Sequence, residues 1–158
     1  MATDAMHEHR HRTSSSALPR WMLVGFIAGA VSVLIFHQGA WALLHSMNFT
    51  PRAPFPMQPT QPFGVPQLWS LAFFGGIWGL LLAASFGRLD GARLVAASVI
   101  FGALLPTLVA WFVVAPLKGA PMAGGFAPAA MAFGLIVNAA WGLGTGLGLL
   151  FFGRPRSA

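Results

Sequence analysis

The sequence predicts an all-α membrane protein, a bundle of four transmembrane helices. Hydrophobic residues make up 56% of its 158 residues, charged residues make up 8%, and the mean hydropathy is +0.71. A soluble domain carries about 25% charged residues, so lipid is the expected surroundings of most of this chain. Four uncharged stretches of helix length separate its basic loops. Because a segment in lipid must satisfy its own backbone hydrogen bonds, we expect each stretch to be helical.

The expected spans cover about residues 21–45, 67–86, 93–114 and 129–152. Each is close to the roughly 20 apolar residues that cross a bilayer, and together they form one transmembrane domain, residues 21–152. Residues 1–20 are expected to be a disordered cytoplasmic tail because they are polar, and residues 153–158 a second cytoplasmic tail. The alternative at the N-terminus is a signal peptide cleaved near Ala40, which the length of the first apolar run disfavours.

The basic residues predict the orientation. Seven of the nine lysines and arginines fall on one side of the expected spans, and Arg52 and Lys118 fall on the other. Basic residues concentrate in cytoplasmic loops, so we expect both termini in the cytoplasm. The formal net charge of +6 lies in tails and loops beside the spans. Anionic lipid headgroups are therefore the expected counter-charge, and no nucleic-acid partner is expected. The seven residues are Arg10, Arg12, Arg20, Arg88, Arg93, Arg154 and Arg156.

Small residues four positions apart occur in every span and predict close helix packing. Such rows let helix backbones approach one another, which matters because lipid supplies no hydrophobic drive for helices to associate. The pattern leaves open which helix each row meets, and a row could also serve a homo-oligomer or a larger membrane complex. Pro106 is expected to kink the third span. The rows are Gly25 and Gly29, Gly75 and Gly79, Ser98 and Gly102, and Gly142 and Gly146.

The two outer loops share an order of features. A proline, a basic residue and a Pro-Met pair follow one another in residues 51–57 and again in residues 116–122. This order favours a tandem duplication of a helical hairpin, whose two copies would be parallel repeats. The alternative is that two proline-rich loops share these features through composition alone.

Few polar side chains fall inside the expected spans. His37 and Asn138 lie at a similar depth, about eight and ten residues from the outer ends of their helices. With Gln38 and Thr107 they form a candidate polar layer. In the favoured interpretation His37 and Asn138 hydrogen-bond across helices and fix the packing. In the alternative, His37, Thr107 and Asn138 form the site of a small passive transporter or channel.

The residues for catalysis or metal binding are lacking. The chain has no cysteine and no carboxylate inside the expected spans, so thiol chemistry and acid–base chemistry by a carboxylate are excluded within the membrane. We expect no enzyme, no cofactor and no metal. A copper(I) site from His45, Met57 and Met122 is the weaker alternative, because methionine is also an ordinary apolar residue. The histidines at 7, 9 and 11 lie beside arginines, which disfavours a cation there.

Two short sequences carry a resemblance to a known family. Phe36-His37-Gln38-Gly39 and Pro62-Phe63-Gly64-Val65-Pro66, in a frame rich in alanine, glycine and leucine, resemble a family of small four-span inner-membrane proteins of proteobacteria that has no assigned function. The resemblance covers most of residues 21–152 and implies a bacterial inner membrane. From the rows of small residues and the lack of catalytic residues, we expect a non-catalytic accessory, scaffold or oligomer-forming subunit.

Overall fold

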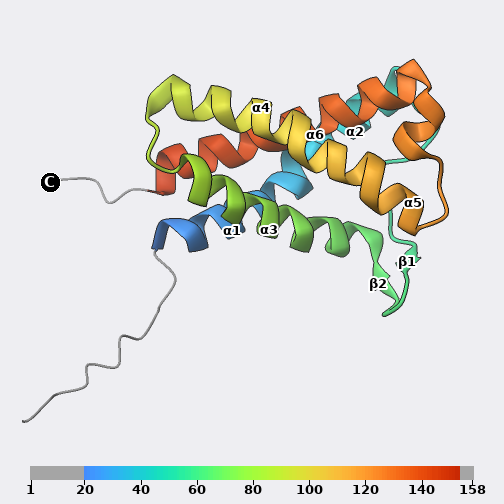
Figure 1. Cartoon of the computed structure of the whole chain (residues 1–158), viewed down its shortest axis with the longest axis horizontal. Helices are drawn as coiled ribbons and strands as arrows, with labels where there is room; N and C mark the ends of the chain where they lie inside the picture. The colour runs from blue at the N-terminus through green and yellow to red at the C-terminus, as the bar shows by residue number, and fades with distance from the viewer. Residues whose placement is uncertain (1–19, 154–158) are drawn as a thin grey trace, which may run out of the picture.

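The computed structural model describes residues 20–153 and is a bundle of four long helices (Figure 1). Four helical segments are long and apolar enough to cross a membrane: Arg20–Ser46, Gln67–Phe86, Gly91–Leu117 and Pro128–Phe152. Their ends lie within three residues of the spans expected from the sequence. The predicted all-α, four-helix fold is confirmed, and the chain is a multi-pass membrane protein. The tails expected at residues 1–19 and 154–158 lie outside the described residues.

Two of the four segments change helix type along their length. The first consists of α1 (Arg20–Ser32), a π-helical turn η1 (Val33–His37) and α2 (Gln38–Ser46). The third consists of α4 (Gly91–Val109), a second π-helical turn η2 (Ala110–Val114) and α5 (Ala115–Leu117). The second and fourth are the unbroken helices α3 (Gln67–Phe86) and α6 (Pro128–Phe152).

The sequence predicted an irregularity of the third span at Pro106. In the structure Pro106 lies within α4, and the change to π-helix begins four residues later, at Ala110. The N–H of Ala110 bonds the carbonyls of both Pro106 and Thr107. The irregular stretch therefore lies beyond the proline, toward the outer loop.

The helices pack in the order α3, α1, α6, α4. The most extensive contacts join α1 to α3 and α4 to α6, and α1 also contacts α6 along the middle of the bundle. Figure 1 shows these two pairs side by side. Helices α3 and α4 are consecutive but meet more sparsely, through Phe101, whose ring lies edge-on to Trp78 and Phe86 at 5.9 and 6.0 Å.

The predicted rows of small residues form the seams within each hairpin. A Cβ added to Gly29 would lie 2.9 Å from the Cα of Gly79, and a Cβ added to Gly102 would lie 2.9 Å from the Cα of Gly142. Real Cβ atoms do not come that close to another backbone. The six glycines expected to serve packing (25, 29, 75, 79, 142 and 146) therefore pack inside the chain, and their rows are not free for a second copy.

The two seams have the same register. The step from Gly29 to Gly102 is 73 residues and the step from Gly79 to Gly142 is 63, and the two pairs make the same close contact. The 73-residue step also relates Arg20 to Arg93, at the starts of α1 and α4. This is the geometry expected of a repeated hairpin, and it gives each position in one hairpin a counterpart in the other.

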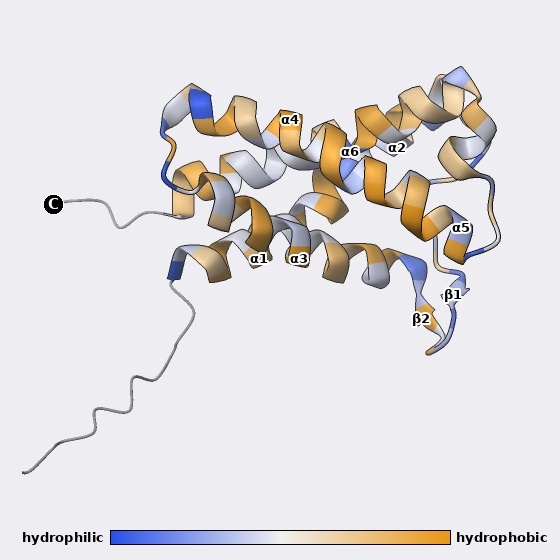
Figure 2. Cartoon of the chain, viewed as in Figure 1, coloured by the Kyte–Doolittle hydropathy of each residue, from blue (hydrophilic) through white to orange (hydrophobic). Residues whose placement is uncertain are grey.

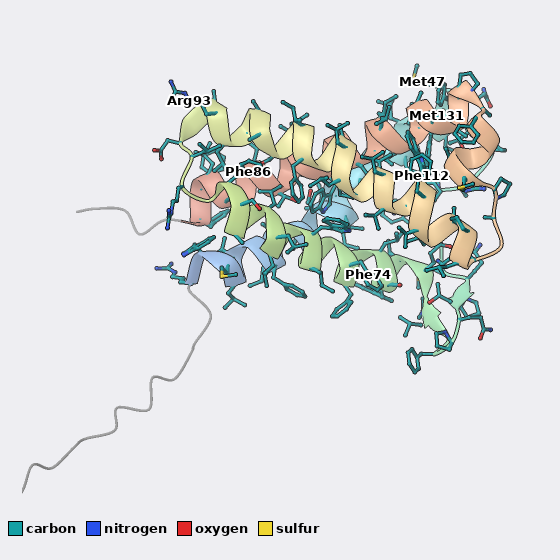
Figure 3. The ribbon with its side chains drawn as sticks, viewed as in Figure 1. Met47, Phe74, Phe86, Arg93, Phe112 and Met131 are labelled. Atoms are coloured by element: carbon teal, nitrogen blue, oxygen red, sulfur yellow. The ribbon has the colours of Figure 1, made fainter. Side chains whose placement is uncertain are left out.

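Polar residues gather at the two ends of the bundle, and the helices between them are apolar (Figure 2). Figure 3 places Arg93 at the end where α4 starts and Met47 at the opposite end. At the Met47 end a short hairpin joins β1 (Pro59–Thr60) to β2 (Val65–Pro66), with Thr60 paired to Val65. The outer loop after α5 contains the short helix η3 (Met122–Phe126).

Candidate functional site: polar groups within the spans

The four candidate polar residues are buried in two separate places. Gln38 is fully buried, Thr107 is 1% exposed and His37 is 9% exposed, and Asn138 is partly buried. The structure brings Thr107 to Asn138 between α4 and α6. It brings His37 to Gln38 beside the first outer loop. Among the described residues, hydrogen bonds do not link these four side chains into one layer.

Thr107 and Asn138 cross-link α4 and α6. The side-chain amide of Asn138 donates to Thr107 Oγ1 over 2.9 Å, and the Thr107 hydroxyl donates to the carbonyl of Gly134 over 3.4 Å. Every group in this chain of bonds belongs to the protein. In lipid such bonds contribute about 0.6 kcal/mol each, so the arrangement holds two helices together.

The sequence predicted His37 as the partner of Asn138, and the structure differs. Two faces of α6 explain the difference. Asn138 lies on the face packed against α4, where a Cβ on Gly102 would touch its carbonyl oxygen. Trp141 lies on the face packed against α1, where its indole N–H donates to the carbonyl of Gly29. The two residues are three positions apart, which leaves them only about 60° apart around α6. Helices α1 and α4 pack on adjoining sides of α6, and these two side chains each bond a different one of them.

Gln38 holds the first outer loop. Its Oε1 accepts the backbone N–H of Phe55 over 2.7 Å, which fixes the orientation of the amide. Its Nε2 lies 3.5 Å from Nδ1 of His37. Since an amide nitrogen can only donate, Nδ1 of His37 is the acceptor of any hydrogen bond between the two. The His37 ring also lies edge-on to Trp41, with centroids 6.1 Å apart.

Two further side chains anchor the same loop. The indole N–H of Trp41 donates to the carbonyl of Arg52 over 2.8 Å, and Nδ1 of His45 lies 3.0 Å from the carbonyl of Thr50. With Gln38 they occupy one face of α2, three and four residues apart. The spacing of Trp41 from Gln38 and His45 is the signal in the sequence for this anchoring face.

The polar groups at the centre of the bundle also bond within the protein. The Ser32 hydroxyl donates to the carbonyl of Trp141 over 2.7 Å, and the Trp141 indole N–H donates to the carbonyl of Gly29 over 2.9 Å. These two bonds tie α1 to α6. Throughout residues 20–153, no fully buried side-chain nitrogen or oxygen lacks a hydrogen-bond partner. The polar groups of the core are therefore committed to helix and loop contacts.

Comparisons with known proteins found no relative of this chain. No protein-family model, curated protein sequence or solved structure matches this chain. The resemblance carried by residues 36–39 and 62–66 stays a prediction. Within the described part of the chain, no three histidines, cysteines or carboxylates come together as metal ligands.

The substitution Thr107→Val is expected to destabilise the α4–α6 pair. Valine has nearly the same shape as threonine but cannot accept the Asn138 bond, which leaves an amide donor unpaired beside lipid. We expect a loss of about 0.6 to 1.7 kcal/mol in the free energy of unfolding, measured by SDS titration of the protein in mild detergent. Thr107→Ser keeps the hydroxyl and is the matched control. Equal stabilities for the two variants would contradict the cross-link.

The substitution Gln38→Met is expected to release the first outer loop. Methionine has a similar length but cannot accept the N–H of Phe55. Since the chain has no cysteine, an added Ala53→Cys provides a single site for a maleimide probe. We expect its labelling to be several-fold faster with Gln38→Met than with the native Gln38. The control is Gln58→Met, an exposed position in the same loop, which should leave the rate unchanged.

Proposed function

We propose that this chain is a non-catalytic accessory or scaffold subunit of a bacterial inner membrane. The observation that supports the proposal is that polar side chains of the core form hydrogen bonds within the chain. Ser32, Trp141, Thr107 and Asn138 bond other groups of this chain, and so does Gln38. A transport site needs polar groups that can exchange partners with a substrate. A set committed to internal bonds favours a structural role.

The orientation proposed for this subunit has both termini in the cytoplasm. Arg20, Arg88 and Arg93 lie at the end of the bundle where α1 and α4 start, and Arg52 and Lys118 belong to the loops of the other end. The positive-inside rule places the first group in the cytoplasm. Single cysteines test this directly. A membrane-impermeant maleimide should label Gly119→Cys in intact spheroplasts, and Ala92→Cys after permeabilisation. The reverse order would invert the topology.

A partner of this subunit would contact its lipid-facing surface. The close-packing glycine rows face each other inside the hairpins. The outer surface carries large exposed side chains such as Ile100, Leu104 and Phe112, which are available to another membrane protein or a second copy. The bilayer and such a subunit are thus the proposed partners.

The experiment is purification of the tagged full chain from its native membrane in mild detergent. The proposal expects a partner, or a second copy, at fixed stoichiometry. It also expects the partner complex to lose abundance when the chain is deleted and to recover when the chain is restored. The small passive transporter, with His37, Thr107 and Asn138 as its site, predicts another result. A monomer that conducts a solute in proteoliposomes, and loses this flux with His37→Ala at unchanged stability, would overturn the scaffold role.

A further inference from the structure

An apolar groove runs along the outside of the seam between α1 and α6. It has a volume of about 360 Å³. Its walls include Ile27 and Val31, which are 53% and 45% exposed, and its ends include Phe36 and Phe152. Its floor contains Gly144 and Gly148, both close to α1. The groove lies on the membrane-spanning surface, so its occupant must come from the bilayer or from another membrane-embedded chain.

The dimensions of the groove favour an acyl chain over a helix. From Val24 to Phe36 it follows α1 for about 18 Å at 1.5 Å per residue. Its volume over that length gives a cross-section of about 20 Å², against about 80 Å² for a helix 10 Å wide. A single extended hydrocarbon chain is slender enough to lie within the groove, whereas a helix could place only its side chains there.

A positive charge stands at the inner end of the groove. Arg20 is exposed and lies one turn before Val24, on the helix face that continues through Ile27 and Val31. At this end of the bundle a lipid lying along the groove would place its headgroup near Arg20. An arginine there attracts an anionic headgroup.

The corresponding seam, between α3 and α4, is filled by aromatic side chains. The 73-residue step that relates the two hairpins relates Ala28, in the groove, to Phe101, which fills the space between α3 and α4 against Trp78 and Phe86. The groove is open because the residues that face each other there are small: Ala28 on α1 and Gly148 on α6. The site is therefore a property of the α1–α6 seam, and Arg93, the counterpart of Arg20, starts a helix without it.

We propose that this groove binds one acyl chain of an anionic phospholipid of the inner leaflet, with Arg20 at the headgroup. The choice of leaflet rests on the orientation proposed above. The groove and its charge do not depend on the scaffold role, because they follow from the shape and charge of the single chain.

The experiment is native mass spectrometry of the delipidated full chain, titrated with phosphatidylglycerol or with phosphatidylcholine of the same acyl chains. We expect one phosphatidylglycerol per chain to bind about fivefold more tightly than phosphatidylcholine, the factor that one basic residue near the membrane surface contributes. Val31→Trp, which fills the groove, should lower phosphatidylglycerol affinity at least fivefold. Arg20→Gln should abolish the preference between the two lipids.

Matched controls separate the groove from the general lipid-facing surface. Ile35→Trp places the same side chain on the same segment, at a 60% exposed position outside the groove, and should leave lipid binding unchanged. Arg93→Gln should leave the lipid preference unchanged. Equal phosphatidylglycerol affinities for Val31→Trp and Ile35→Trp at equal thermal stability would overturn the proposal. So would a dimer that Val31→Trp dissociates, because the groove would then belong to a second copy.

Discussion

The substitution Gly29→Val is expected to separate α1 from α3 and to cost about 3 kcal/mol of the free energy of unfolding, the upper end of the range for overpacking. The added Cβ would lie 2.9 Å from the Cα of Gly79 and would also collide with the carbonyl of Gly75. Backbone atoms cannot rotate away as a side chain can, so the two helices must move apart. SDS titration followed by tryptophan fluorescence measures the loss.

The control for this effect is Gly39→Val in α2. Gly39 is exposed, and a Cβ added to it meets no atom within 4 Å. The substitution brings the same change in helix propensity without a collision, so we expect a change of less than about 0.5 kcal/mol, as for other surface positions. A similar loss at positions 29 and 39 would show that the collision at the α1–α3 seam is not the cause.

The substitution Trp141→Ala is expected to have the largest effect of a side-chain truncation. Trp141 is 2% exposed. Its indole N–H bonds Gly29, and its carbonyl accepts the hydroxyls of Ser32 and Thr145. Removing the ring leaves a cavity where the two hairpins meet and should cost about 3 to 5 kcal/mol. The measurement is the midpoint of unfolding in the same SDS titration.

Trp78→Ala is the matched comparison, because Trp78 is the counterpart of Trp141 in the other hairpin. It is only partly buried and lies edge-on to Phe101. We expect it to cost about half as much as Trp141→Ala, since a partly buried ring makes fewer packing contacts and leaves a smaller cavity when removed. Trp141→Phe isolates the hydrogen bond to Gly29 and should cost about 0.6 kcal/mol. Equal losses for Trp78→Ala and Trp141→Ala would contradict the central role of Trp141.

The sequence was sufficient for the helices and their packing residues, because both depend on local pattern. The uncharged stretches gave the four spans, and the spacing of Gly29 and Gly79 identified close-packing positions. Which helix each row of small residues packs against was not predictable from the sequence of one helix. Gly29 meets Gly79 in its own hairpin, although Gly142 of another helix follows the same pattern. The register and the order of the helices decide between them.

The structure buries His37, Gln38 and Thr107, and it does not pair His37 with Asn138. Depth alone suggested that His37 pairs with Asn138, but rotation about α6 turns Asn138 toward Thr107. The partner of Gln38 is the backbone N–H of Phe55, 17 residues further along a proline-rich loop. A backbone group carries no signature in the sequence, so this contact required the path of the loop.

The anchoring of the first outer loop has a consequence for its tolerance to change. Gln38, Trp41 and His45 bind backbone groups of residues 50–55, and none of them binds a side chain of the loop. The side chains of Arg52 and Ala53 are exposed. The anchoring bonds therefore do not depend on the side chains at positions 52 and 53. Proline is the exception at positions 52 and 55, whose N–H groups bond Thr50 Oγ1 and Gln38 Oε1. This segment can accept an epitope or a new recognition sequence while the helices beneath it keep their structure.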